Sequence, residues 1–190
     1  EARYIQLLKG EDAIEFPEDG YHGEDIIEHM KNYIAENGDK LLNVEPSERK
    51  KILVKYALEK NIARIKKDLE DYGVKFDVWF SEQSLYDSGE FEDTMKYLKE
   101  NGLTMEKDGA VWFKATEFGI EKDEVIIRNN GIPTYFASDI AYHRNKFQKR
   151  KFDRVINLWG ADHHGHVARM KAAVGSLGIN PDKLDIVIFQ

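Results

Sequence analysis

The segment RVINLWGADHHGHVARMKAAVGSLGINPDKLDIVIF, residues 154–189, decides the fold of this chain. It holds two apolar runs rich in β-branched side chains, 154–158 and 185–189, on either side of an amphipathic stretch at 166–177. The pattern predicts a strand, a helix and a second strand, and a connection of this length makes the two strands parallel. Ligands of parallel sheets bind beyond the carboxyl ends of the strands, so residues 159–166 form the first candidate site.

The composition indicates a globular chain with an acidic balance. Its 190 residues include 28 Lys and Arg against 35 Asp and Glu, a formal net charge of −7, and 42% are hydrophobic. We therefore expect one domain, or one with a small companion, for which any contact with DNA or RNA is local. No DNA partner is expected. Cysteine is absent, which excludes disulfides, thiolate metal sites and cysteine nucleophiles and fits a reducing compartment. No stretch has the pattern of a membrane span or a signal peptide, so we expect a soluble, cytoplasmic protein with no membrane partner.

The first third of the chain is predicted to be helical. Residues 26–34 place apolar side chains at helical spacing before Gly38 ends the helix, and a longer helix begins at Pro46-Ser47 and is closed by Gly73. The longer helix carries eight lysines and arginines along one side, with acidic residues interleaved. This pattern is typical of a solvated helix face, and a contact for an anionic partner such as RNA is the alternative.

In the middle of the chain the spacing of apolar residues changes from a helical to an alternating pattern. Residues 74–80 alternate and are rich in β-forming residues, which predicts a strand. Ser88 is expected to cap a helix that Gly102 ends, and Asp108-Gly109 lies between two short β-prone runs, as in a hairpin.

The rest of the pattern completes an α/β fold. Residues 125–127 predict a further strand, and a helix is expected from Tyr135 to about Lys149. The chain is therefore predicted to divide into a mainly helical segment at 1–75, an insertion of strand, helix and β-hairpin at 76–124, and an α/β part at 125–190.

The turn at 159–166 (WGADHHGH) is the densest polar cluster, with three of the six histidines beside Asp162. Its glycines let a ligand approach the backbone, and the following helix N-terminus favours negative charge. Asp162 suits the hydroxyls of a ribose, and the imidazoles suit a phosphate or carboxylate. Three alternatives remain: a metal site that His143 joins, a His-x-Gly-His nucleotide motif, and histidines that only cap a helix. Manganese phosphoesterases with an Asp-His-His motif also need an early Asp-x-Asp pair, which is absent.

The second cluster, residues 134–139, places Tyr135 and Asp139 four residues apart, on one face of the predicted helix. A carboxylate beside a phenol is a good receptor for a guanidinium, which pairs bidentately with the carboxylate and is attracted to the aromatic face. The alternative is a helix whose tyrosine packs inward and whose aspartate is solvated.

Together the two clusters carry a resemblance to a known family. YFASDIAY at 135–142 and GADHHGHV at 160–167 strongly resemble arginyl-tRNA synthetase. YHGE at 21–24, FDVWFSE at 76–82 and the stretch at 98–113 also match patterns of that family, so the resemblance covers essentially the whole chain.

The resemblance implies a class I aminoacyl-tRNA synthetase with a Rossmann-type catalytic domain. Residues 125–190 would then be the second half of its nucleotide-binding parallel sheet, with helical and hairpin insertions before it. The family joins L-arginine to ATP, with magnesium as the counter-ion of ATP, and passes the arginyl group to tRNA(Arg). It has no tightly bound cofactor, and its members generally need bound tRNA even for the first step.

The resemblance also implies site residues. Tyr135 and Asp139 would hold the arginine side chain, and His163 stands where related enzymes often place a glutamine near the amino acid. On the adenosine side of the pocket we expect Gly160, Asp162 and His166, with Glu24 as a neighbour.

No catalytic or metal-binding residue of the family is expected in this segment. The family's His-x-Gly-His signature lies upstream of the region seen here, so the letters at 163–166 match it by accident, and its Lys-Met-Ser-Lys-Ser-like loop would follow Gln190. We therefore expect the segment to be inactive alone. A non-catalytic module that binds arginine or a nucleotide is the alternative. The basic stretch at 143–154 is where a local RNA contact is sought, although the favourable position of cations at a helix C-terminus is the preferred explanation.

Overall fold

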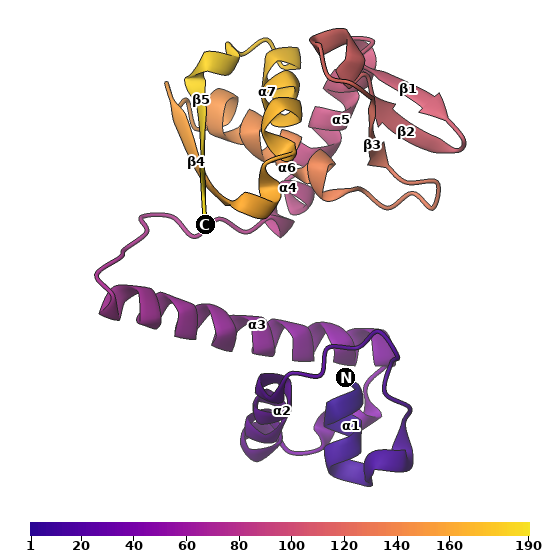
Figure 1. Ribbon diagram of the computed structural model, residues 1–190. Helices are drawn as coiled ribbons and strands as arrows, with labels where there is room; N and C mark the ends of the chain where they lie inside the picture. Colours follow the sequence, from indigo (N-terminus) through magenta and orange to yellow (C-terminus); the bar gives the residue numbers. More distant parts are fainter. The chain divides into compact units, whose positions relative to one another are not determined.

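The computed structural model describes all residues, 1–190, as a mixed α/β protein. The chain forms two compact units, Glu1–Val78 and Trp79–Gln190, and each has its own apolar core. Figure 1 shows a helical first unit and a second unit in which helices pack on two small sheets. No helix is long and apolar enough to cross a membrane.

The first unit is built from α1 (Ala2–Lys9), α2 (Glu24–Asn37) and α3 (Pro46–Asp71). Its core is formed by buried side chains of all three helices and the turn before α3: Tyr4, Ile5, Met30, Tyr33, Leu41 and Leu53. Gly38 ends α2 with a φ of 71°, a conformation that favours glycine. The predicted helices and their glycine stops are therefore confirmed here.

The long helix α3 contributes to the core mainly through its first half. Leu53 is buried, whereas Val54, Leu58 and Ile65 are 48–55% exposed. Its basic side chains form surface ion pairs with acidic residues: Lys51–Glu48, Lys55–Glu59, Lys60–Glu36, Arg64–Asp68 and Lys67–Asp71. These pairs favour a solvated face over an RNA contact.

Residues 74–80 are not a strand, which corrects the prediction from their alternating pattern. They form an irregular segment that follows α3. Val74, Phe76 and Val78 are 37–56% exposed, because no neighbouring strand supplies the hydrogen bonds and the apolar face that a strand needs.

The second unit begins with α4 (Gln83–Asp87) and α5 (Glu90–Glu100). Ser88 does not cap α5, as its sequence position had suggested. It ends α4, and Gly89, with a φ of 76°, precedes α5 instead. The Ser88 hydroxyl donates a hydrogen bond of 3.0 Å to the side chain of Glu90, so it supports the same junction by another contact.

A three-stranded antiparallel sheet follows. It consists of β1 (Thr104–Lys107), β2 (Ala110–Phe113) and β3 (Glu124–Ile127), in that order. Asp108 and Gly109 have φ values of 54° and 73°, the left-handed geometry of a two-residue hairpin turn. The predicted hairpin and the strand after it are confirmed.

The second sheet holds β4 (Val155–Gly160) and β5 (Leu184–Phe189), which pair in parallel from Val155–Leu184 to Gly160–Phe189. Helix α7 (His166–Ser176) forms the crossover between them and lies beside them in Figure 1. The predicted parallel strand–helix–strand unit is confirmed, and the turn after β4 lies at the carboxyl end of a parallel strand.

Helix α6 (Tyr135–Arg144) packs against α4, α5, α7 and β3. Its contacts bury Phe136, Ala137, Ile140 and Ala141. The helix continues into a π-helical turn, η4 (Asn145–Lys149), in which the Arg150 amide donates to the Asn145 carbonyl at 2.8 Å. π-Turns inside helices are frequent at functional sites.

Candidate functional site

The first turn of α6 is fixed to β3 by Thr134. Its hydroxyl donates to the Val125 carbonyl at 2.9 Å and accepts from the Ala137 amide at 3.4 Å, so one side chain caps the helix and fastens it to the sheet. This junction sets the direction of the residues that follow it, Tyr135 and Asp139.

Tyr135 and Asp139 both lie on α6, in environments of opposite character. The Tyr135 side chain is 81% exposed, so it does not pack inward. Asp139 is half-buried, and its burial raises the pKa of its carboxyl. The charge of Glu82 raises that pKa further, while Lys146, His163 and Arg169 lower it. A half-buried carboxylate beside an exposed phenol is suited to a cationic ligand.

Glu82 was missed by the sequence reasoning about this cluster. It immediately precedes α4, 57 positions before Asp139. It lines a cavity of about 410 Å³ together with Tyr135 and Ser138. A second carboxylate near Asp139 makes this region attractive to a cation. The sequence signal was the FDVWFSE motif, which was noted as a resemblance without a role for its glutamate.

The turn after β4 groups three aromatic rings. The centroids of His163 and His166 are 5.6 Å apart, and Trp159 lies 5.8 Å from the first and 6.5 Å from the second. Asp162 is exposed, with a carboxylate oxygen 3.4 Å from His163 Nε2. At Gly160 a Cβ atom would lie 2.6 Å from the Asp162 Oδ1, so a larger residue there would displace the exposed Asp162 side chain.

A second cavity, of about 490 Å³, connects the two predicted clusters. Tyr135 and His166 both line it, with Trp112, Lys122 and Arg128 among its other lining residues. We call it the Tyr135–His166 cavity. The structure thus brings one residue from each of the two predicted clusters to one space. Asp139 and His163 are also close enough for their charges to interact, as the effect on the pKa of Asp139 shows.

Glu24, the expected neighbour of the site, is the first residue of α2 and belongs to the unit Glu1–Val78.

A buried polar network lies beneath Asp139. His143 Nδ1 is 2.7 Å from the Asp139 carbonyl, and its Nε2 is 2.8 Å from Asn157 Nδ2. Asn157 Oδ1 in turn accepts from Lys146 Nζ at 3.1 Å. Burial lowers the pKa of His143 to about 4 and that of Lys146 to about 8. His143 is therefore neutral at pH 7, donates through Nδ1 and accepts at Nε2, and it anchors α6 to β4.

The alternative of a metal site at the histidine cluster is not supported by the arrangement of the side chains. No group of three His, Asp or Glu side chains is placed to hold a metal ion. His143 is committed to the Asp139 carbonyl and Asn157, and His166 Nδ1 accepts a hydrogen bond from Arg169 at 3.0 Å. The metal-dependent phosphoesterase is therefore not favoured.

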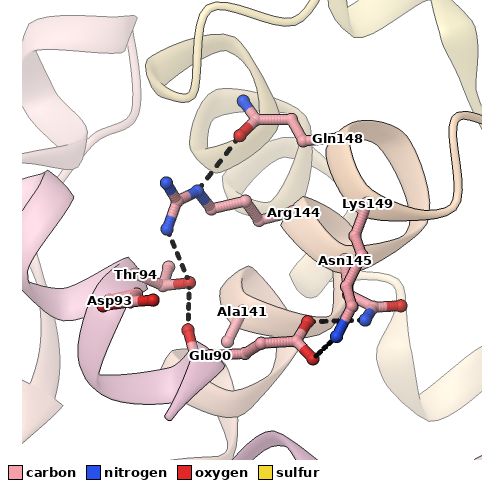
Figure 2. Close-up of a pocket in the computed structure, with 8 residues that line it drawn as sticks. All are labelled: Glu90, Asp93, Thr94, Ala141, Arg144, Asn145, Gln148 and Lys149. Carbon is pink, nitrogen blue, oxygen red and sulfur yellow. Dashed lines mark hydrogen bonds and ion pairs between the residues drawn. The ribbon is translucent and has the colours of Figure 1, made fainter. Parts of the chain in front are cut away.

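The basic stretch at 143–154 is mostly engaged within the protein. Figure 2 shows part of it around a cavity of about 230 Å³: Lys149 pairs with the Glu90 carboxylate, which also accepts from Asn145 at 2.6 Å. Arg144 donates to Gln148 at 3.1 Å. Arg154 pairs with Asp185. These contacts leave few free cations on this stretch for an RNA.

A family model for the catalytic domain of class I tRNA synthetases, type R, matches residues 22–189. An arginine–tRNA ligase from Acetivibrio thermocellus is 77% identical over the whole chain, and one from Ruminiclostridium cellulolyticum is 70% identical. The chain spans 34% of the length of each of these curated relatives.

Solved structures agree with these matches. A putative arginyl-tRNA synthetase from Campylobacter jejuni superposes with a TM-score of 0.85 at 35% identity, covering all of this chain and 41% of that one. The arginyl-tRNA synthetase of Plasmodium falciparum superposes with a TM-score of 0.68 over 99% of this chain and 33% of that one; at 19% identity it supports the fold alone.

Proposed function

Because the chain belongs to the catalytic-domain family of class I tRNA synthetases, type R, we propose that it is part of an enzyme that joins L-arginine to ATP and passes the arginyl group to tRNA(Arg). The observation that carries this proposal is the half-buried Asp139 carboxylate, with the exposed Tyr135 ring on its helix and the Glu82 charge nearby. Asp139 pairs with the substrate guanidinium, Tyr135 lies against it, and Glu82 adds to the negative potential. His163, whose charge lowers the pKa of Asp139, is the third residue proposed for the amino-acid pocket.

The nucleotide side of the site is the turn after β4. The parallel β4–α7–β5 unit is the second half of a Rossmann-type sheet in this proposal, and its ligand lies at the carboxyl end of β4. Gly160, Asp162 and His166 contact the adenosine part of ATP. Asp162 is exposed and able to accept from the ribose hydroxyls. Magnesium arrives with ATP as its counter-ion.

The tRNA partner is supported by charges in the Tyr135–His166 cavity. Lys122 and Arg128 line it and form no ion pair, whereas six of the eight cations of α3, and Lys149 and Arg154 of the stretch 143–154, pair with carboxylates. Trp112 and Tyr135 line the same cavity. Unpaired cations beside aromatic rings suit a single-stranded RNA end. The 3′ end of tRNA enters this cavity in the proposal.

Catalysis belongs to the whole protein, for which a cytoplasmic location is proposed. Adenylate formation requires positioning and charge stabilisation at the α-phosphate. Two signature motifs supply most of these groups in the family. The chain has no Lys-Met-Ser-Lys-Ser-like loop, and its one His-x-Gly-His string, 163–166, is at a different place in the fold, so we expect this chain alone to bind substrates weakly without reacting them.

Isothermal titration of the full-length protein with L-arginine, and with L-lysine as control, tests the proposal. We expect arginine to bind and lysine to bind at least about 100-fold more weakly, because an ammonium cannot pair bidentately with Asp139. Equal affinities for the two amino acids, or none for arginine in the presence of tRNA, would contradict it.

RNA binding is tested separately, through the salt dependence of tRNA affinity. Lys122→Gln and Arg128→Gln are each expected to reduce the slope of log affinity against log salt by about one. Lys151→Gln, which removes an exposed lysine that lines none of the described cavities, is the matched control. Unchanged slopes in both cavity variants would exclude this route for the RNA.

A further inference from the structure

Arg169 holds the ring of His166 from one turn further along α7. Its Nε donates to His166 Nδ1 at 3.0 Å, and its Nη1 pairs with the Glu124 carboxylate at 3.0 Å. Its guanidinium also lies 5.7 Å from the centre of the Phe136 ring. The side chains of Arg169 and Glu124 are only 21% and 17% exposed, so water competes little for these contacts.

These contacts determine which nitrogen of His166 carries the proton. A guanidinium donates hydrogen bonds and keeps its charge, so Nδ1 of His166 must accept. In a neutral imidazole the single proton is then on Nε2. The protein supplies no hydrogen-bond partner for that N–H.

The charges around His166 keep its ring neutral. Burial, Arg169 on the same helix and His163 in the preceding turn lower the pKa of His166, while Glu124 on β3 opposes them. The Trp159 ring beside it carries no charge, and Lys122, Asp123 and Arg128 line the same cavity without being among the causes of this shift. His166 therefore presents an N–H donor at neutral pH and is not a cation there.

We propose that Arg169 is a positioning residue for nucleotide binding, which fixes His166 in the tautomer that donates from Nε2, and that Glu124 in turn fixes Arg169. This inference rests on the proposed function, in which His166 contacts the adenosine part of ATP. A donor at Nε2 meets the hydroxyl and phosphate oxygens of the nucleotide. The other tautomer would present only a lone pair there, which repels a phosphate oxygen and can meet a ribose hydroxyl only as its acceptor.

The same contacts link two parts of the unit. Glu124 belongs to the antiparallel sheet through β3, and Arg169 belongs to the crossover helix of the parallel sheet. A ligand in the Tyr135–His166 cavity, which both residues line, therefore adjoins the contacts that set the state of His166.

The first test reads the tautomer without substrate. In the full-length protein with ¹⁵N-labelled histidine, we expect the NMR shifts of His166 to indicate a protonated Nε2. Arg169→Met is expected to give a mixture of tautomers and a pKa of His166 closer to its ordinary value. Arg169→Lys, which keeps a donor, restores the tautomer. Glu124→Gln removes a charge that raises the pKa of His166, and it lowers that pKa.

The second test separates nucleotide from amino-acid binding. Arg169→Met is expected to raise KM for ATP about tenfold, the loss of one good hydrogen bond, and to leave KM for arginine within about twofold. Arg3→Met is the matched control, because Arg3 in the other unit also lies over a phenylalanine ring and donates to a neutral acceptor, Gln6.

The outcomes separate this inference from the proposed function. An unchanged His166 tautomer in Arg169→Met overturns the inference, and so does a changed tautomer with an unchanged KM for ATP. An unchanged KM for ATP in His166→Ala contradicts the nucleotide assignment of His166 itself. If Arg169→Met does not fold, Arg169→Gln decides by the same measurement, because an unchanged tautomer of His166 in that variant overturns the inference.

Discussion

Helices α3 and α6 use charged residues in opposite ways. α3 carries eight lysines and arginines, yet most of them are exposed and pair with acidic neighbours on the surface. α6 and its π-turn carry fewer charges and bury three of them at least partly: Asp139, His143 and Lys146 all have pKa values moved by desolvation. The comparison teaches that burial of ionisable groups, and not their density, distinguishes the helix of the proposed site from α3.

The largest effect is expected from a test of this comparison that removes one carboxylate charge from α6 and one from α3. Asp139→Asn is expected to weaken L-arginine binding to the full-length protein about a thousandfold, because the guanidinium loses its paired charge in a partly desolvated site. Asp68→Asn removes a carboxylate that pairs with Arg64 on the surface of α3 and should change the affinity less than twofold. Calorimetric titration measures both affinities. A similar loss of arginine affinity in the two variants would contradict the distinction between the charges of α6 and those of α3.

The next test uses pH. The folded pKa of His143 is about 4, below its ordinary 6.5, so the unfolded chain takes up a proton in this window that the folded chain does not. The contribution of His143 to stability is complete above pH 6.5, and roughly 3 kcal/mol is lost as the pH falls to 4. Urea unfolding of wild type and His143→Gln across this range measures it. The two proteins should differ in their pH dependence, and parallel curves would contradict the buried, neutral histidine.

A third test asks whether a buried charge contributes to the stability of the helical unit. Arg49 is the buried cation of α3: it is 8% exposed, pairs with the Glu1 carboxylate at 2.8 Å and donates to the Leu41 carbonyl at 3.2 Å. Arg49→Met is expected to destabilise this unit by about 2 kcal/mol, because buried acceptors lose their donor. Thermal unfolding followed by circular dichroism, with Lys50→Met as the exposed neighbour control, measures it. A cost equal to that of the control would show that this buried charge is dispensable.

The smallest effect is expected on the outer side of α3. Replacing Lys67, which pairs with Asp71, by methionine should change the unfolding free energy by no more than about 0.5 kcal/mol. It should leave tRNA affinity unchanged within twofold, as measured by filter binding at two salt concentrations. A clear loss of affinity would instead restore the RNA-contact interpretation of this helix.

Sequence signals only a few residues long predicted most of the helices, strands and turns. The glycine at the end of α2, the Asp108-Gly109 turn and the apolar strands at 154–158 and 185–189 each carry a signal within a few residues, and the structure places elements there. The strand predicted at 74–80 was wrong because alternation alone does not supply a pairing partner.

The site was harder to predict because its pieces are far apart in the chain. Tyr135 and Asp139 were found by their helical spacing. The neighbourhood of Glu82 and Asp139, and the contact of Glu124 with Arg169 across 45 positions, depend on tertiary packing. The burial of Lys146 was equally hidden, since its basic stretch looks like any helix C-terminus in sequence.

The π-helical turn after α6 makes this part of the chain sensitive to length. Its i→i+5 hydrogen bond encloses one more residue than an α-helical turn does. Deleting one residue from 145–149 would let the α-helix continue, and every later side chain would swing by about 100° around its axis. Asn145 and Lys149 could then not both reach Glu90, as they do now. A change in the number of residues here is therefore harder to accommodate than most changes in their identity.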